Sequence, residues 1–287
     1  MGAAAGEGSA GTFRGADGLL LHAHAWTAAE PRASLLVAHG LGEHAGRYAT
    51  LAADLVARGV SVYAPDHRGH GRSPGTRGHV GRFAELVDDF EAFRLHVAAG
   101  LPPGLPVFLL GHSLGGLVAI RHLEEHPEAG YAGAVLSAPL LGVALRPPAW
   151  KTSLAGLLAR LVPALRLRNG VDAADLSTDD AVVAAYRADP LVHPWITPRL
   201  YAEIRAAMRV AVERRDRIRA PLLFVVPGED RIVLAEATEE FARGAACEVE
   251  VRRFPGFRHE SLNERERATV VAGIAEWMAG RIAVQLP

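Results

Sequence analysis

The chain has 287 residues, of which 49% are hydrophobic and 22% are charged, and its net charge is -1. This composition is typical of a globular protein that is long enough for one large core with an inserted subdomain. The near-neutral balance, without a long run of like charges, gives no electrostatic basis for binding nucleic acid, so we expect no nucleic-acid partner.

Residues 1–11 are rich in alanine and glycine and contain neither a basic residue nor a long apolar run. They lack both parts of a secretory signal, and we expect them to form a disordered lead-in. No stretch of the sequence approaches the ~20 continuous apolar residues that span a membrane. The sequence therefore favours a cytoplasmic protein and leaves peripheral contact with a membrane open.

From Thr12 onward, short apolar runs alternate with longer amphipathic segments. The apolar spacing predicts helices over 48–58, 83–97, 114–123, 235–243 and 264–282. The compact runs predict strands over 35–38, 60–64, 107–110, 133–136, 222–226 and 248–254, with an edge hairpin from 12–14 and 19–26. Such alternation predicts a mostly parallel sheet with helices on both faces, which is an α/β fold.

The alternation stops at residues 140–215, where prolines are frequent and the patterns are helical. We interpret this segment as a helical cap inserted into a core made of 12–139 and 216–287. Large apolar residues from Trp150 to Leu165 follow helical spacing and form one stripe. The stripe either packs onto the core or is partly exposed as a hydrophobic rim that contacts a micelle or membrane transiently.

The strongest chemical signal is the sequence GHSLG at 111–115, which fits the Gly-x-Ser-x-Gly pattern. It follows a predicted strand and precedes a predicted helix, which is the context of a nucleophile elbow. Glycines on either side leave room for a serine to protrude from a sharp turn. Ser113 is therefore the candidate nucleophile.

A second glycine-rich turn, HGLG at 39–42, follows the predicted strand 35–38. Ester hydrolysis requires backbone N–H groups aimed at the developing oxyanion. We expect one from Leu114, the residue after the nucleophile, and one from Leu41 in this turn.

An acid and a base follow the last two predicted strands. Asp230 comes after strand 222–226, and His259 comes after strand 248–254. The chain order serine, acid, histidine is that of the α/β-hydrolase fold, in which the histidine accepts the serine proton and the acid orients the imidazole. The adjacent Glu229 is an alternative acid.

We interpret the other histidines and the cysteine as structural residues. The pairs His67/His70 and His22/His24 lack carboxylate or cysteine companions in the sequence, so no metal site is expected. Cys247, the single cysteine, is expected to be a small apolar core residue at the start of the last strand.

Four motifs together resemble those of the monoacylglycerol lipases and related lysophospholipases. They are HGLGEHAGRY (39–48), DHRGHGRS (66–73), GHSLGG (111–116) and SAP (137–139). The resemblance extends from about residue 11 to the end of the chain, and it is loose in the cap. It implies a serine hydrolase that acts on a small lipid ester, a monoacylglycerol above all, and that needs no cofactor.

The resemblance supports the triad Ser113, Asp230 and His259 and the donors Leu41 and Leu114. A lysophospholipase and a broad-specificity carboxylesterase remain alternatives, as do a cofactor-free haloperoxidase and a non-catalytic binding protein. Serine in the elbow disfavours epoxide and haloalkane hydrolases, which use aspartate. Glu43 and Arg47 either help to bind the substrate head group or pair with each other and hold the loop.

Overall fold

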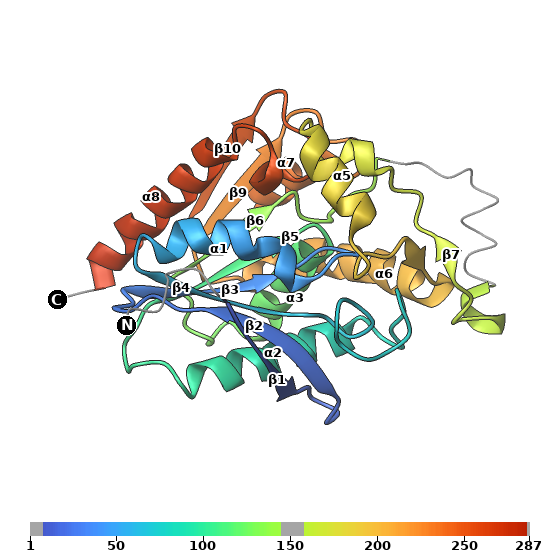
Figure 1. Ribbon diagram of the computed structural model, residues 1–287, viewed down its shortest axis with the longest axis horizontal. Helices are drawn as coiled ribbons and strands as arrows, with labels where there is room; N and C mark the ends of the chain where they lie inside the picture. Colours follow the sequence, from blue (N-terminus) through green and yellow to red (C-terminus); the bar gives the residue numbers. More distant parts are fainter. Residues whose placement is uncertain (1–7, 145–157, 286–287) are drawn as a thin grey trace.

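A mixed sheet of eight strands forms the centre of the molecule, in the computed structural model that describes residues 8–144 and 158–285 (Figure 1). Its order is β1-β2-β4-β3-β5-β6-β9-β10. β1 and β2 form an antiparallel hairpin, β2 pairs antiparallel with β4, and the remaining neighbours are parallel. The strands are β1 (Ser9–Arg14), β2 (Leu20–Trp26), β3 (Ala33–Ala38), β4 (Val60–Pro65), β5 (Val107–His112), β6 (Gly133–Ser137), β9 (Leu222–Pro227) and β10 (Val249–Phe254).

Helices cover both faces of this sheet, and two separate hydrophobic clusters fill the space beneath them. Successive strand residues point to opposite faces. The helices of these layers are α1 (Ala49–Val56), α2 (Ala84–Ala98), α3 (Leu114–Glu125), α7 (Ala235–Gly244) and α8 (Arg267–Gln285), with short 3-10 turns η1 (Ala45–Tyr48), η3 (Arg215–Arg217) and η4 (Ser261–Asn263). In β3, Leu35 and Val37 pack with α1 and α8, whereas Leu36 and Ala38 pack with α2 and α3.

The predicted α/β-hydrolase fold is confirmed, and the boundaries of its elements differ by a few residues. β1 begins at Ser9, so residues 9–11 pair with β2 instead of belonging to a disordered lead-in; residues 1–7 lie outside the described part. Cys247 lies in a bend before β10 and is half-buried. Burial raises the pKa of its thiol, which agrees with an unreactive, partly apolar role.

In the described residues between β6 and β9, the chain forms two longer helices and a small ribbon in place of further sheet strands. α5 (Asp180–Ala188), α6 (Pro198–Arg214) and η2 (Ala173–Asp175) are joined by the two-stranded sheet β7 (Leu167–Arg168) and β8 (Trp195–Ile196). Figure 1 shows β7 and α6 on the opposite side of the molecule from the two chain ends. We propose that 140–215 is a cap on a core of 12–139 and 216–287; its β-ribbon was not expected from the helical sequence pattern.

The predicted cap helix can be compared with the structure only from residue 158 onward, because 150–157 lie outside the described residues. Residues 158–161 are helical. Ala159 is buried, whereas Leu161 is 69% exposed and Val162 and Leu165 are also exposed. In this part Leu158 is half-buried, whereas the stripe from Leu161 to Leu165 faces solvent and does not pack onto the core.

Within the described ranges, none of the helices combines the length and the apolar character that crossing a bilayer requires.

Candidate active site

Ser113 occupies a sharp turn between β5 and α3. Its backbone has φ 52° and ψ -118°, a conformation that non-glycine residues rarely adopt. The neighbouring glycines allow this turn to close. A Cβ at Gly111 would lie 2.8 Å from the Cα of Gly116, and one at Gly115 would clash with the backbone oxygen of Ala38. The motif therefore packs strand β5, helix α3 and strand β3 closely around the serine.

His259 and Asp230 lie in loops that follow the adjacent strands β10 and β9. The His259 Nδ1 atom is 2.8 Å from Asp230 Oδ2, and both side chains are buried. The other carboxylate oxygen, Oδ1, accepts the backbone N–H groups of Ile232 and Val233. Glu229, the alternative acid, is exposed. The structure thus pairs His259 with Asp230 through Nδ1, so Nε2 is the imidazole nitrogen that does not contact this carboxylate.

The pKa values of this pair reflect burial and mutual attraction. Burial alone lowers the pKa of His259, but the charge and hydrogen bond of Asp230, followed by the charges of Glu260 and Glu43, raise it above its ordinary value. Burial raises the pKa of Asp230, yet His259 and the two backbone N–H groups bring it below its ordinary value. At neutral pH the pair therefore holds a carboxylate next to an imidazole of increased basicity.

The two expected N–H donors belong to segments that adjoin Ser113. Leu114 is the first residue of α3, and the first N–H groups of a helix have no acceptor within it. Leu41 lies in the loop after β3 and lines the same cavity as Ser113. Its neighbour Gly40 is so near that an added Cβ would lie 3.4 Å from the Cβ of Ser113. Both residues therefore lie close to Ser113. Because of the role that we propose for Leu41 below, residues 39–42 are called the oxyanion loop.

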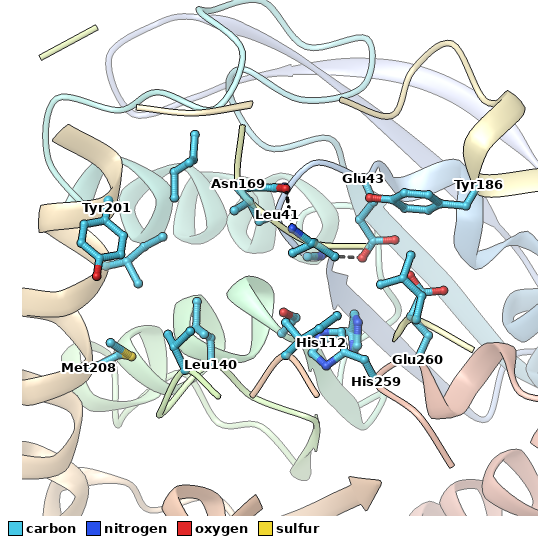
Figure 2. Close-up of a pocket in the computed structure, with 18 of the residues that line it drawn as sticks. Leu41, Glu43, His112, Leu140, Asn169, Tyr186, Tyr201, Met208, His259 and Glu260 are labelled. Atoms are coloured by element: carbon cyan, nitrogen blue, oxygen red, sulfur yellow. Dashed lines mark hydrogen bonds between the residues drawn. The ribbon is translucent and has the colours of Figure 1, made fainter. Parts of the chain in front are cut away.

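A cavity between the core and the 140–215 segment has Ser113 and His259 in its wall. Figure 2 shows Tyr201, Leu140 and Met208 at one side, and Glu43, Tyr186 and Glu260 at the other. Leu41 and His259 lie between them. The further apolar lining is provided by Val143, Val171, Leu176, Ile196, Ile204 and Ile232. Arg205 of α6 and Asn169 also line the cavity. The cavity therefore has one mainly apolar end and one end rich in carboxylates, with Ser113 and His259 between them.

The polar end is built from a buried network of charges. Arg47 donates to Glu43 at 2.7 Å and, through two nitrogens, to both oxygens of Glu260 at 2.6 and 2.7 Å. Glu43 also accepts the Gly40 N–H at 2.6 Å and the Tyr48 hydroxyl at 2.9 Å. Of the two roles left open for Glu43 and Arg47, the pairing that holds the loop is observed. Glu43 additionally lines the cavity.

The histidines of the 66–73 motif lie behind the oxyanion loop. His39 Nε2 accepts the His67 backbone N–H at 3.0 Å, and its Nδ1 lies 2.8 Å from the Gly40 carbonyl oxygen. Burial, followed by the nearby His70, lowers the pKa of His39 to about 3. A neutral His39 therefore ties the motif to the oxyanion loop, which agrees with the structural role expected from the sequence.

The sequence reasoning missed three site residues. Glu260 could have been found from its position directly after His259. Tyr186 and His193 belong to the cap, where no sequence pattern indicates which residue reaches the core. The Tyr186 ring lies under the Arg47 guanidinium at 4.8 Å, and the His193 N–H donates to the Gly42 carbonyl at 2.8 Å.

Comparison with known proteins places this chain among hydrolases. The profile of the family described as serine aminopeptidase, S33, matches residues 29–266. A monoacylglycerol lipase of Mycolicibacterium smegmatis is 35% identical over 94% of this chain and 97% of its own length. A phospholipase of Bacillus subtilis is 30% identical over 85% of this chain and 94% of its own length.

Solved structures agree with these sequence relatives. The crystal structure of a monoacylglycerol lipase from Paleococcus ferrophilus superposes with a TM-score of 0.83 at 34% identity, covering 91% of this chain and 99% of that one.

Proposed function

The chain belongs to the serine aminopeptidase, S33, family of α/β hydrolases, and from that premise we propose that it hydrolyses monoacylglycerols through an acyl-enzyme on Ser113. The observation that carries this proposal is the position of Ser113. It lies in a strained turn at the start of α3, in the wall of the cavity that also contains His259 paired with Asp230.

The proposed reaction follows from these positions. His259 takes the proton of Ser113 as Oγ attacks the ester carbonyl carbon, and the N–H groups of Leu41 and Leu114 stabilise the oxyanion. Collapse of this adduct breaks the ester C–O bond, and His259 returns the proton to the leaving alcohol. A water molecule, deprotonated by His259, then attacks the acyl carbon; the Ser113 Oγ–C bond breaks, His259 returns the proton to Oγ, and the fatty acid is released.

The two ends of the cavity support a lipid ester as substrate. The apolar end, with Leu140, Tyr201 and Met208, suits an acyl chain because burying CH₂ groups contributes about 0.8 kcal/mol each. The polar end holds two carboxylates, Glu43 and Glu260, and one guanidinium. Because the two carboxylates share the single guanidinium of Arg47, these three residues together carry a net negative charge. It therefore favours a neutral glycerol over the phosphate of a lysophospholipid.

The exposed apolar residues of the cap support contact with the lipid phase. Leu161, Val162, Leu165 and Leu167 are exposed together within 161–167. A monoacylglycerol resides in micelles or bilayers, so such a surface would let it reach the cavity without crossing water. We propose that this cap patch, defined as these four residues, makes transient contact with that surface.

The test is a substrate panel combined with active-site labelling. We expect kcat/KM to be highest for long-chain monoacylglycerols, lower for diacylglycerols and lysophosphatidylcholine, and negligible for an aminoacyl arylamide. Ser113→Ala and His259→Ala should each lower kcat by roughly 10⁴-fold, and the double variant should lose little more. A fluorophosphonate probe should label the wild type and fail to label Ser113→Ala.

Other outcomes would redirect the assignment. Fast turnover of short esters without preference for chain length would make the protein a broad carboxylesterase, and preference for lysophosphatidylcholine would make it a lysophospholipase. Labelling and turnover that survive Ser113→Ala would overturn the serine mechanism.

A further inference from the structure

Three potential metal ligands converge beside the edge hairpin, outside the candidate active site. His22 and His24 lie two residues apart on β2, so their side chains project from the same face of the strand. Asp66 directly follows β4, which pairs with β2 so that Ala23 lies opposite Pro65. The sequence showed the two histidines without an acidic companion; the strand pairing brings Asp66 to them from more than 40 residues away.

The separation between the His22 and Asp66 ligand atoms matches that in a tetrahedral site. One ligand atom from each residue lies within 4.8 Å of the other two. His22 Nδ1 is 3.4 Å from Asp66 Oδ2, close to the ~3.3 Å edge of a tetrahedron whose centre-to-ligand distances are about 2.0–2.1 Å. His22 Nδ1 is buried and has no hydrogen-bond partner among the described residues. A buried nitrogen without a partner is costly unless something else satisfies it.

The ligands are held in place by other contacts. The Asp66 N–H donates to the His22 carbonyl oxygen at 2.8 Å, which fixes the two residues relative to each other. The Asp66 carboxylate accepts N–H groups from Ala45 at 2.8 Å and Arg72 at 2.7 Å, and each of its oxygens retains a lone pair. The His24 ring stacks on Trp26 with centroids 5.3 Å apart. Such outer contacts orient the ligands of metal sites.

A second cluster in the described part of the chain is a weaker candidate. Glu91, His122 and His126 also converge, but both Glu91 oxygens accept hydrogen bonds from Arg94. His122 Nε2 lies 3.0 Å from the Tyr131 hydroxyl. His122 Nδ1 is buried without a hydrogen-bond partner among the described residues, as His22 Nδ1 is. The Glu91 carboxylate, however, is already paired with the Arg94 guanidinium, so a metal ion would have to compete with that cation, and this cluster serves as an internal comparison.

We propose that His22, His24 and Asp66 bind one divalent transition-metal ion, with Zn²⁺ the best match to two imidazoles and one carboxylate in tetrahedral geometry. Solvent would complete the coordination at the partly exposed His24. The ion would tie β2 to the start of the 66–73 loop and so stabilise the edge of the sheet. None of the three residues lines the cavity that contains Ser113, so the role is structural, not catalytic.

The test uses the full chain without an affinity tag, freed of metal with EDTA and then dialysed. CoCl₂ should produce the visible absorption of tetrahedral Co²⁺ at one equivalent per chain, and ZnCl₂ should displace it and raise Tm. His22→Ala and His24→Ala should each abolish the absorption and the Tm increase. Asp66 is not substituted, because its carboxylate also holds two backbone N–H groups.

His126→Ala is the matched control and should bind cobalt as the wild type does. If His126→Ala loses the absorption and His24→Ala keeps it, the ion binds the second cluster and the proposal is wrong. Absence of saturable cobalt or zinc binding by the metal-free protein would also overturn it. Ester hydrolysis should be equal before and after EDTA; a loss restored by zinc would contradict the separation from catalysis.

Discussion

At the scale of single residues, the site combines a strained serine with a histidine of increased basicity. The Ser113 backbone conformation costs on the order of 1–3 kcal/mol, which the packing of β5 and α3 must offset. His259 is held by Asp230, and the carboxylates of Glu260 and Glu43 add negative potential. These carboxylates belong to the network centred on Arg47, so the basicity of His259 depends on its sequence neighbour Glu260 and on Glu43 from the loop after β3.

The residue-scale prediction concerns the pH dependence of activity. The proposed base must be neutral, so kcat/KM should rise with pH through the raised pKa of His259, above its ordinary value of about 6.5. Glu260→Gln removes a negative charge that favours the imidazolium, so the acid limb should move to lower pH. Glu266→Gln, an exposed change in the same segment, is the control and should leave the limb unmoved. An upward shift in Glu260→Gln would contradict the electrostatic account.

At the scale of elements, the junction of β5 and α3 depends on close backbone contact. Gly115, in the first turn of α3, faces the backbone oxygens of Ala38 and His39 at the end of β3. β3 is paired on both sides, so its backbone has little freedom to move away. The glycine pattern thus serves the packing of two elements as well as the reactivity of the serine.

We predict that Gly115→Ala lowers the free energy of unfolding by several kcal/mol or prevents folding, because the added methyl group overpacks a rigid backbone contact. Gly280→Ala provides the matched helical control. Among the described residues, no atom outside the adjacent turns of its own helix lies within 4 Å of the added Cβ, so Gly280→Ala should be neutral or stabilising by up to about 1 kcal/mol. Thermal and urea unfolding of both variants measure this, and equal stabilities would refute the contact argument.

The second element-scale prediction concerns the cap patch. Leu161→Ser combined with Leu165→Ser should slow hydrolysis of long-chain monoacylglycerol dispersions severalfold and leave soluble short esters unaffected, because both side chains already face solvent. Leu95→Ser, at an equally exposed leucine on α2, should change neither rate. A fall in Tm with both substrates affected alike would instead make these leucines part of a packed interface.

At the scale of the whole molecule, the segment 140–215 is attached to both loops that carry the candidate site. The N–H group of His193, in 140–215, donates to the carbonyl oxygen of Gly42 in the oxyanion loop. The N–H group of Glu260, in the loop that carries His259, donates to the carbonyl oxygen of Leu176 in 140–215. Arg47 contacts all three parts: its own loop, Glu260 and the Tyr186 ring of the cap. This connection fixes the oxyanion loop, the base and the cap relative to one another.

Arg47→Lys tests that connection, because an ammonium group cannot form the two-pronged bond to Glu260 while also reaching Glu43. We expect kcat to fall roughly 10- to 100-fold with a smaller change in KM, since slight misplacement of reacting groups costs about that much. Arg94→Lys, which changes a similar two-pronged pair with Glu91 on α2, should leave kcat unchanged. A loss of Tm without a change in kcat would show that Arg47 only supports the fold.

The sequence by itself determined the succession of core strands and helices along the chain and the positions of Ser113, Asp230 and His259 after predicted strands. Both follow from local patterns: apolar runs bounded by glycine or proline, helical spacing, and a motif in which steric crowding requires glycine. These signals extend over a few neighbouring residues, which is why they can be read without knowing the fold.

The tertiary structure alone decided which distant side chains meet. The Arg47–Glu260 pair and the approach of Asp66 to His22 join segments that strand pairing brings together, and no local pattern specifies them. The outward orientation of Leu161 was likewise undetermined, because helical spacing defines a stripe but not the surface it faces. Burial, charge compensation and metal-ligand geometry are properties of such long-range contacts, so they depend on packing rather than on sequence periodicity.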